Sequence, residues 1–398
     1  MKILIADKLD PTAVEALTQL GTEVRSQPDL KAEDLPEVLG ETEVLVVRST
    51  KVKTPALAAA PKLSLVVRAG AGVNTIDVAE ASHRGIYVAN CPGKNTAAVA
   101  ELALGLIIAA DRQIVGASNA LRAGEWKKKE FGKASGLKGR TLGLLGVGQI
   151  GVAVARRAQG LGMEVMAWSR SLTPERAKEL GLQFAASPIE VAQRADVISV
   201  HLASTPQTRH LVDASFFAAL KTGAIFVNTS RGELVDTEAL REAILPKSLR
   251  VGLDVFENEP AGGLAEFEDT ALAGVLTATP HIGASTDQAA EAIAAEVVRI
   301  ISLYKKTGKP PNTVNMGESL AATHSLSIRH FNRVGVLATV LDALKKEDIN
   351  IQEMENTIFQ EGRAAFASLL LDRGPSDLLL KNLRAHEDIL QIRLSSRS

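Results

Sequence analysis

The chain has 398 residues, of which 46% are hydrophobic and 23% charged, and its formal net charge is -1. This length predicts two or three domains, and this composition excludes long disordered segments. The near-neutral charge disfavours a nucleic-acid or membrane-surface binder, and no apolar run is long enough to predict a membrane span. A single cysteine, Cys91, excludes a disulfide framework or a cysteine-based zinc site, and we expect no metal. We therefore expect a cytoplasmic protein.

Short runs rich in β-branched residues alternate with helical patterns over the first ninety residues. Strands are predicted at 3–6, 44–47, 65–67 and 86–89, and helices at 11–20 and 75–83. This alternation is typical of parallel βαβ units. The next helical pattern, 97–121, is apolar on nearly every face and predicts one long helix buried between two layers.

A second alternating series begins at residue 141, with strands predicted at 141–145, 164–168, 196–201, 224–228, 250–254 and 275–277. Six strands with helices between them match a doubly wound dinucleotide-binding fold. A helix over 286–306 follows. The remaining pattern predicts strands at 324–331, 350–359, 364–371 and 389–394, and helices at 334–346 and 377–385. We predict an α/β protein with two doubly wound parallel sheets and a C-terminal ferredoxin-like βαββαβ module.

The sequence GVGQIG at 146–151 has the G-x-G-x-x-G spacing directly after a predicted strand and at the start of a helix. Gly146 permits the tight turn, Gly148 lets a pyrophosphate approach the backbone, and Gly151 lets helix and strand pack closely. Gln149 and Ile150 open the helix, whose N–H groups can bind phosphate. A glycine-rich turn without a ligand is the alternative. The context favours a dinucleotide.

The position where an NAD site normally carries an acid holds Ser169 and Arg170 instead. A hydroxyl and a guanidinium suit a 2′-phosphate better than a free diol, so the pair favours NADP or use of both cofactors. The alternative is that Arg170 is a solvated loop residue.

An arginine, an acid and a histidine follow the carboxyl ends of three successive predicted strands: Arg231, Glu259 and His281. Ligands of open parallel sheets bind at this edge. Arg231 can hold a carboxylate through two hydrogen bonds, and a carboxylate at one imidazole nitrogen of His281 leaves the other free to take a proton. Glu257 is a rival to Glu259 as that carboxylate.

Four motifs together, GVGQIG, NTSRGELVD, GLDVFENEP and TPHIGAST, resemble the D-2-hydroxyacid dehydrogenases and, within them, the phosphoglycerate dehydrogenase branch. The resemblance covers essentially the whole chain. It implies that Arg231, Glu259 and His281 are catalytic and that Asp254 lies near the nicotinamide carboxamide. It also implies cofactor contacts for Thr96 and Ser230.

The same resemblance implies a substrate cleft lined by six residues near the N-terminus: Arg48, Ser49, Gly70, Ala71, Gly72 and Asn95. The alternative for Arg48 and for the nearby Arg68 is a strand-end charge in solvent. The implied topology has a discontinuous substrate domain, 1–95 and 286–318, with the dinucleotide-binding domain, 96–285, inserted in it.

The C-terminal module, 322–398, resembles an ACT regulatory domain. The resemblance implies that His330, Asn332 and Asn350 bind L-serine as a feedback effector. Val334 stands where proline is usual in this loop. The alternative is a module that only makes dimers.

The implied reaction is NAD(P)-dependent oxidation of 3-phospho-D-glycerate to 3-phosphohydroxypyruvate, the first step of serine biosynthesis. We expect a small phosphorylated 2-hydroxy acid as substrate and a homodimer or homotetramer. One alternative is an NADPH-dependent glyoxylate or hydroxypyruvate reductase, which Ser169 and Arg170 favour and the ACT-like module disfavours. Another is a non-catalytic nucleotide-sensing scaffold that resembles a corepressor.

Overall fold

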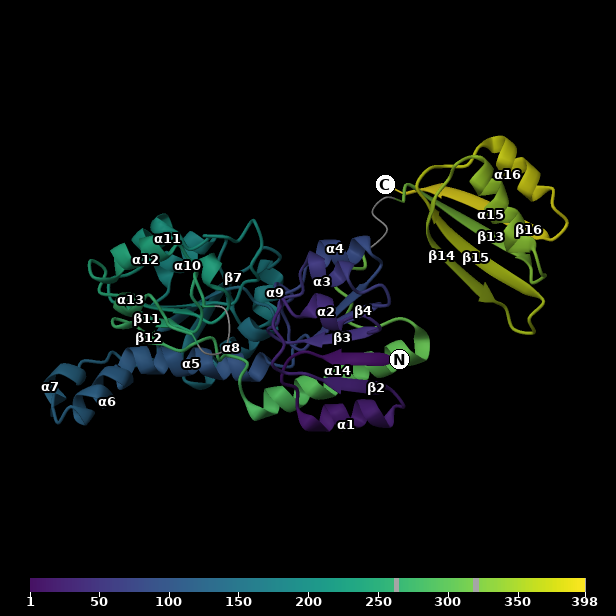
Figure 1. The fold of residues 1–398 in the computed structure, drawn as a ribbon. Coiled ribbons are helices and arrows are strands. Elements are labelled where there is room, and N and C mark those ends of the chain that lie inside the picture. The colour runs from purple at the N-terminus through teal and green to yellow at the C-terminus, as the bar shows by residue number, and fades with distance from the viewer. Residues whose placement is uncertain (261–264, 318–321, 398) are drawn as a thin grey trace. The chain divides into compact units, whose positions relative to one another are not determined.

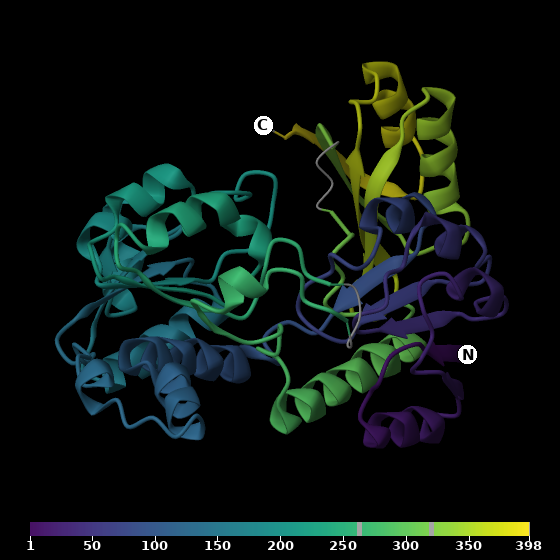
Figure 2. The ribbon, with the colours of Figure 1, turned by 60° about the vertical axis from the view of Figure 1, so that its left-hand side comes forward.

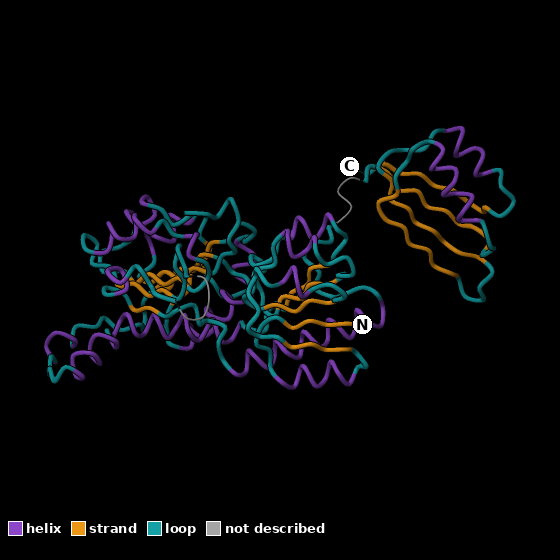
Figure 3. Tube along the Cα trace, in the orientation of Figure 1, coloured by secondary structure: helices purple, strands orange, loops and turns teal. Residues whose placement is uncertain are grey.

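The computed structural model describes residues 1–260, 265–317 and 322–397. Two compact units are present, Met1–Asn315 and Met316–Ser398. The first unit contains two parallel sheets and the second a single antiparallel sheet (Figure 3). Within the described ranges, no helix is both long and apolar enough to span a membrane.

The first sheet has five parallel strands in the order β2-β1-β3-β4-β5 (Figure 1). They are β1 (Lys2–Ile5), β2 (Glu23–Ser26), β3 (Val44–Val47), β4 (Leu65–Arg68) and β5 (Tyr87–Asn90). Two helices cover one face, α1 (Pro11–Gln19) and α14 (Asp287–Thr307). Three shorter ones cover the other, α2 (Leu35–Val38), α3 (Thr54–Ala58) and α4 (Val78–His83). The predicted strands are present, and β2 was not predicted because its sequence, EVRS, is polar and lies at the sheet edge.

The second sheet has seven parallel strands in the order β12-β11-β10-β9-β6-β7-β8. They are β6 (Thr141–Leu145), β7 (Glu164–Trp168), β8 (Gln183–Phe184), β9 (Val197–Val200), β10 (Ile225–Asn228), β11 (Arg250–Leu253) and β12 (Thr277–Ala278). This is the dinucleotide-binding order with one strand added, and it reverses between β6 and β9. The prediction of six strands missed β8, which has only two residues.

Helices flank this sheet on both faces. They are α8 (Gln149–Gly160), α9 (Pro174–Glu179), α10 (Pro188–Arg194), α11 (Ala214–Ala219), α12 (Thr237–Ile244) and α13 (Thr270–Ala273), with a 3-10 turn at Gly232–Leu234. The apolar side chains of these helices and of the strands between them form two continuous cores, one on each face of the sheet.

The prediction of one helix over 97–121 was wrong, because two helices occupy this segment: α5 (Thr96–Arg112) and α6 (Ile114–Arg122). Between them Gln113 adopts a left-handed conformation, with φ of 52°. Buried residues run along α5 as far as Asp111, whereas only Ala120 is buried in α6. The chain therefore turns where it leaves the sheet (Figure 2), and the short helix α7 (Lys128–Phe131) follows.

The second unit has four antiparallel strands in the order β14-β15-β13-β16. The strands are β13 (His324–Phe331), β14 (Ile351–Ile358), β15 (Ala364–Leu371) and β16 (Ile389–Ser396). The helices α15 (Val336–Lys346) and α16 (Asp377–Arg384) share an apolar core with β13 and β15. The predicted ferredoxin-like arrangement is thus confirmed.

Candidate active site

The glycine-rich loop between β6 and α8 has the shape that a dinucleotide requires. A Cβ on Gly146 would lie 2.6 Å from the carbonyl oxygen of His201, and one on Gly151 would lie 2.2 Å from the carbonyl oxygen of Gly146. No atom lies within 4 Å of the position that a Cβ of Gly148 would occupy. Gly148 also precedes α8 without a side-chain cap, so the first N–H groups of the helix are available. The open side at Gly148 and the uncapped helix fit a pyrophosphate.

His281 and Glu259 form the central pair of the site. The Nδ1 of His281 lies 2.7 Å from Oε2 of Glu259, and the backbone N–H of Phe256 donates to Oε1 of Glu259 at 3.0 Å. Burial would raise the pKa of Glu259, but the hydrogen bond and charge of His281 bring this pKa below its usual value. When Nδ1 carries the proton donated to Glu259, Nε2 of His281 is the acceptor nitrogen.

Asp254 holds the loop on which His281 stands. Its buried carboxylate accepts hydrogen bonds from the Thr279 hydroxyl at 2.6 Å, the Ile282 N–H at 2.8 Å and the Gly283 N–H at 2.9 Å. Burial raises the pKa of Asp254, and these three donors offset part of the effect. His281 itself has a φ of 52°, a strained conformation for a residue with a side chain. The loop is therefore fixed by Asp254, a role that the sequence did not indicate.

Arg231 lies on the loop after β10, which Asn228 shapes. The amide of Asn228 donates to the carbonyl oxygen of Arg231 at 2.8 Å and accepts from the N–H of Ser230 at 3.0 Å. The Ser230 hydroxyl donates to the Val200 carbonyl oxygen at 2.7 Å, so its proton is already engaged within the protein. Asn228 is 1% exposed and was not among the predicted site residues. The sequence could have indicated Asn228, because it is a polar residue at the end of a predicted buried strand.

Three guanidinium groups, those of Arg48, Arg68 and Arg231, lie close enough together for the charges of Arg48 and Arg231 to act on Arg68. The Nη2 of Arg231 lies 2.4 Å from the position that a Cβ of Gly72 would occupy, and the guanidinium of Arg68 lies over Gly70 in the same way. Burial, and after it the positive charges of Arg231 and Arg48, lower the pKa of Arg68 to about 10. The Nε of Arg68 has no partner within the described ranges. This cluster is suited to an anion with more than one negative charge.

The connection from the first sheet to α5 touches the glycine-rich loop. A Cβ on Gly93 would lie 2.2 Å from Oε1 of Gln149, and the Thr96 hydroxyl lies 3.5 Å from the same oxygen. Asn95 precedes α5, and its side chain makes no capping hydrogen bond. The predicted residues Gln149, Thr96 and Asn95 therefore lie together at this crossing. On the other side of the site, the amide of Asn90 donates to the carbonyl oxygen of Ala71 at 2.5 Å and holds that loop.

Ser169 and Arg170 follow β7, beside the glycine-rich loop, because the N–H of Gly146 donates to the carbonyl oxygen of Trp168 at 2.8 Å. Ser169 is partly buried and Arg170 is exposed. Within the described part of the chain, no acidic side chain pairs with Ser169 or Arg170, so both can meet a ribose substituent at this edge.

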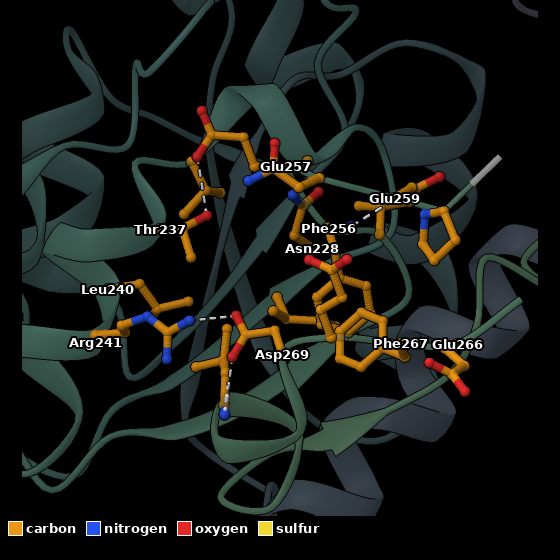
Figure 4. Close-up of a pocket in the computed structure, with 18 residues that line it drawn as sticks. Asn228, Thr237, Leu240, Arg241, Phe256, Glu257, Glu259, Glu266, Phe267 and Asp269 are labelled. Carbon is orange, nitrogen blue, oxygen red and sulfur yellow. Dashed lines mark hydrogen bonds and ion pairs between the residues drawn. The ribbon is translucent and has the colours of Figure 1, made fainter.

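Glu257 takes part in a different cluster. It lies 2.5 Å from Nε2 of His210 and accepts from the Thr237 hydroxyl at 3.0 Å. A cavity of about 720 Å³ adjoins this cluster and is lined by Thr237, Glu257 and Glu259 among others (Figure 4). Its lining includes Glu259 but neither His281 nor Arg231, so the cavity borders the site on the side of Glu259.

The three predicted regulatory residues are not brought together within one module. Both ring nitrogens of the buried His330 have partners, the Phe331 carbonyl oxygen at 2.8 Å and the Asn356 amide oxygen at 3.3 Å. Asn332 donates to the Gly362 carbonyl oxygen at 2.9 Å, near the same end of the sheet. Asn350 precedes β14 at the opposite end, because Leu371 pairs with both His324 and Ile351, whereas Ala365 pairs with both His330 and Ile358. Six residues along β13 and β15 separate the two levels, or about 20 Å.

The second sheet has the strand order of a dinucleotide-binding fold, and the site combines an arginine with a histidine–carboxylate pair. Together these two features define an oxidoreductase-like protein. The family described as "D-isomer specific 2-hydroxyacid dehydrogenase, NAD binding domain" matches residues 104–283. D-3-phosphoglycerate dehydrogenase of Methanocaldococcus jannaschii is 39% identical over 320 residues, which are 79% of this chain and 60% of the relative. Glyoxylate reductase of Thermococcus litoralis is 40% identical over 289 residues, 71% of this chain and 86% of the relative.

Among solved structures, the NADPH-dependent glyoxylate/hydroxypyruvate reductase of Sinorhizobium meliloti, in complex with NADP and malonate, superimposes with a TM-score of 0.67. The identity is 28%, and the match covers 79% of this chain and 96% of that structure. The chain belongs to the D-isomer specific 2-hydroxyacid dehydrogenase family. It spans only 60% of the length of the M. jannaschii phosphoglycerate dehydrogenase.

Proposed function

We propose that this protein is an NAD(P)-dependent dehydrogenase that oxidises 3-phospho-D-glycerate to 3-phosphohydroxypyruvate, the entry reaction of serine biosynthesis. The observation that carries the proposal is the position of Arg231, whose charge acts both on Glu259 of the His281–Glu259 pair and on Arg68, which also feels the charge of Arg48. A phosphorylated 2-hydroxy acid carries a carboxylate and a phosphate, and it needs several cations as well as one base. The M. jannaschii relative, named for this substrate, supports the choice.

The chain's own residues divide the chemistry as follows. Nε2 of His281 accepts the proton of the C2 hydroxyl, and Glu259 stabilises the imidazolium through Nδ1. Arg231 orients the substrate carboxylate and the developing carbonyl oxygen. The bound nicotinamide supplies the acceptor for the hydride that leaves C2. Asp254 acts by holding the His281 loop, and the open space at Gly148 and the uncapped start of α8 support a pyrophosphate site at the helix N-terminus.

The proposed reaction also implies a division of the chain into domains. We propose 1–95 and 286–318 as the substrate domain, 96–285 as the dinucleotide domain and 322–398 as a regulatory module. The antiparallel bridge of Ala89 with Thr313 supports the return of the chain to the first sheet. With one buried cysteine, Cys91, the protein suits a reducing compartment such as the cytoplasm.

A test of the reaction is a panel of 3-phosphoglycerate, glycerate and glycolate, each with NAD and with NADP, on the full chain. We expect 3-phosphoglycerate to have the highest kcat/KM. His281→Ala should lose about 10²–10⁴-fold in kcat while the cofactor still binds, as expected for removal of a general base. His83→Ala, at an exposed position, is the matched control. Near-native turnover by His281→Ala would contradict the mechanism.

Glyoxylate or hydroxypyruvate reduction is the second candidate. Its support is the Ser169–Arg170 pair, which carries no acid against a 2′-phosphate, and the T. litoralis glyoxylate reductase, of which this chain covers 86%. Arg68→Ala separates the two candidates. If phosphoglycerate is the substrate, this change lowers kcat/KM for phosphoglycerate by about 10–100-fold more than for glyoxylate, because a phosphate contact is lost.

We further propose a homo-oligomer whose C-terminal modules bind L-serine between two copies. All but the first two residues of β14 are exposed, and its outer edge has no neighbouring strand within the described ranges. Such an edge favours pairing with another strand. Antiparallel pairing of two copies of β14 would carry Asn350 of one copy to the level of His330 and Asn332 in the other. A serine site formed by two copies could therefore include His330, Asn332 and Asn350, which a single module does not bring together.

A further inference from the structure

Asp7 follows β1 and faces the loop that begins with Arg48. Its Oδ2 accepts three backbone hydrogen bonds in succession, from the N–H groups of Arg48 at 2.7 Å, Ser49 at 3.1 Å and Thr50 at 3.0 Å. Its Oδ1 lies 3.2 Å from the Ser49 hydroxyl. Consecutive N–H groups that converge in this way form a concave anion site, and here a side chain of the protein occupies it.

This carboxylate is also close enough to the guanidinium of Arg68 for its charge to be felt there. Its negative charge acts on Arg68, where it opposes the effects of burial and of the charges of Arg231 and Arg48. Asp7 therefore does two things with opposite consequences for an anionic substrate. It fixes the backbone that presents Arg48, and it cancels part of the positive charge that attracts the anion.

We propose that Asp7 is a positioning residue for the substrate anion: its carboxylate organises the 48–50 loop for binding, and its charge weakens that binding. The proposal rests on the assignment of a phosphorylated 2-hydroxy acid to this cleft. No chemical step is assigned to Asp7.

Two substitutions separate the two effects. Asp7→Asn keeps a carbonyl oxygen that can accept the three N–H groups, and it removes the negative charge. Asp7→Ala removes both. Asp10→Ala is the matched control, because Asp10 lies in the same segment but caps α1 through the Thr12 N–H instead of binding the 48–50 loop.

We expect Asp7→Ala to raise KM for 3-phosphoglycerate about tenfold, as the loss of charge-assisted hydrogen bonds to the loop would. Asp7→Asn should lower KM about two- to threefold at low ionic strength and lose this advantage at high salt. The Kd for the cofactor and the KM of Asp10→Ala should stay at wild-type values. An equal rise in KM for both Asp7 variants, or no change in either, would overturn the proposal.

Hydrogen exchange of the full chain gives a readout that does not depend on the substrate. The amides of 48–50 should exchange faster in Asp7→Ala, and they should match the wild type in Asp7→Asn. Unchanged exchange in Asp7→Ala would overturn the proposal, whatever the substrate. If exchange changes as expected but wild-type protein binds 3-phosphoglycerate in calorimetry without turning it over, the proposed reaction is wrong and the ordering role of Asp7 stands.

Discussion

Replacement of Glu296 by Gln should destabilise the first unit in a pH-dependent way. Glu296 lies on α14, and its side chain is 6% exposed. It accepts from Nε of Arg299 at 3.1 and 3.0 Å, from the Asn312 amide at 2.7 Å, and from Nζ of Lys94, 3.2 Å away. These contacts, the Arg299 hydrogen bond foremost, lower the pKa of Glu296 from 4.5 to about 2 against the opposing effect of burial.

The magnitude follows from linkage between ionisation and folding. At about 1.4 kcal/mol per pKa unit, the ionised Glu296 stabilises the folded state by roughly 3 kcal/mol at neutral pH. The folded-state pKa lies below the unfolded-state value, so this stability is present above pH 4.5 and is lost as the pH falls toward 2. By the same relation, about 1 kcal/mol is lost at pH 4 and about 2 kcal/mol at pH 3.

Urea denaturation of the full chain measures the effect. The two tryptophans, Trp126 and Trp168, both lie in the first unit, so their fluorescence reports its unfolding. Glu296→Gln should lower the free energy of unfolding by about 3 kcal/mol at pH 7 and by only about 1 kcal/mol at pH 3. Glu291→Gln, at an exposed position of the same helix, should change little. A deficit in Glu296→Gln that is the same at both pH values would refute the reasoning.

Three further changes test other parts of the molecule. NADPH should bind wild-type protein at least as well as NADH, and Ser169→Asp should shift the preference toward NADH in nucleotide titrations; a strong NADH preference of the wild type would contradict this. Gly232→Ala should lower kcat/KM more than about 100-fold, because the new Cβ would lie 2.0 Å from the Phe256 carbonyl and displace the Arg231 loop. Gly40→Ala, with no atom within 4 Å of its Cβ, is the control for that measurement. Asn350→Ala should weaken L-serine binding in calorimetry without changing uninhibited kcat, and a wild type that gives no heat with serine would leave the module without this effector.

Most of the strands could be predicted because each is a short apolar run between helical patterns. The elements that escaped prediction lack that signal: β2 is polar at a sheet edge, and β8 has two residues. The break at Gln113 escaped for another reason. The helical pattern continues through Gln113, whereas the burial that supports α5 ends at Asp111, just before the turn.

The sequence predicted residues of the site that follow strand ends, and it missed residues that act by holding a loop. The order of strands in a parallel sheet brings Arg231, Glu259 and His281 to one edge, so their sequence positions were informative. Asp7 and the loop at 48–50 are bonded across 41 to 43 residues, and no local pattern reveals such a contact. For Asn350 the sequence misled in the opposite direction. The resemblance to an ACT domain assigned Asn350 and His330 to one binding site, but the register of the sheet places them at opposite ends of one module.

Two buried carboxylates bracket the places where the chain crosses between the two parallel sheets. Asp254 fastens residues 279–283 to the end of β11, and Glu296 fastens Lys94 and Asn312 to α14. Between these fastened segments, the first crossing leaves only the residues around Asn95, and the second leaves only 284–286 before α14 begins. Any rotation of one sheet against the other must therefore change the backbone dihedral angles of these few residues. The segment around Asn95 and residues 284–286 are thus the pivots of the first unit.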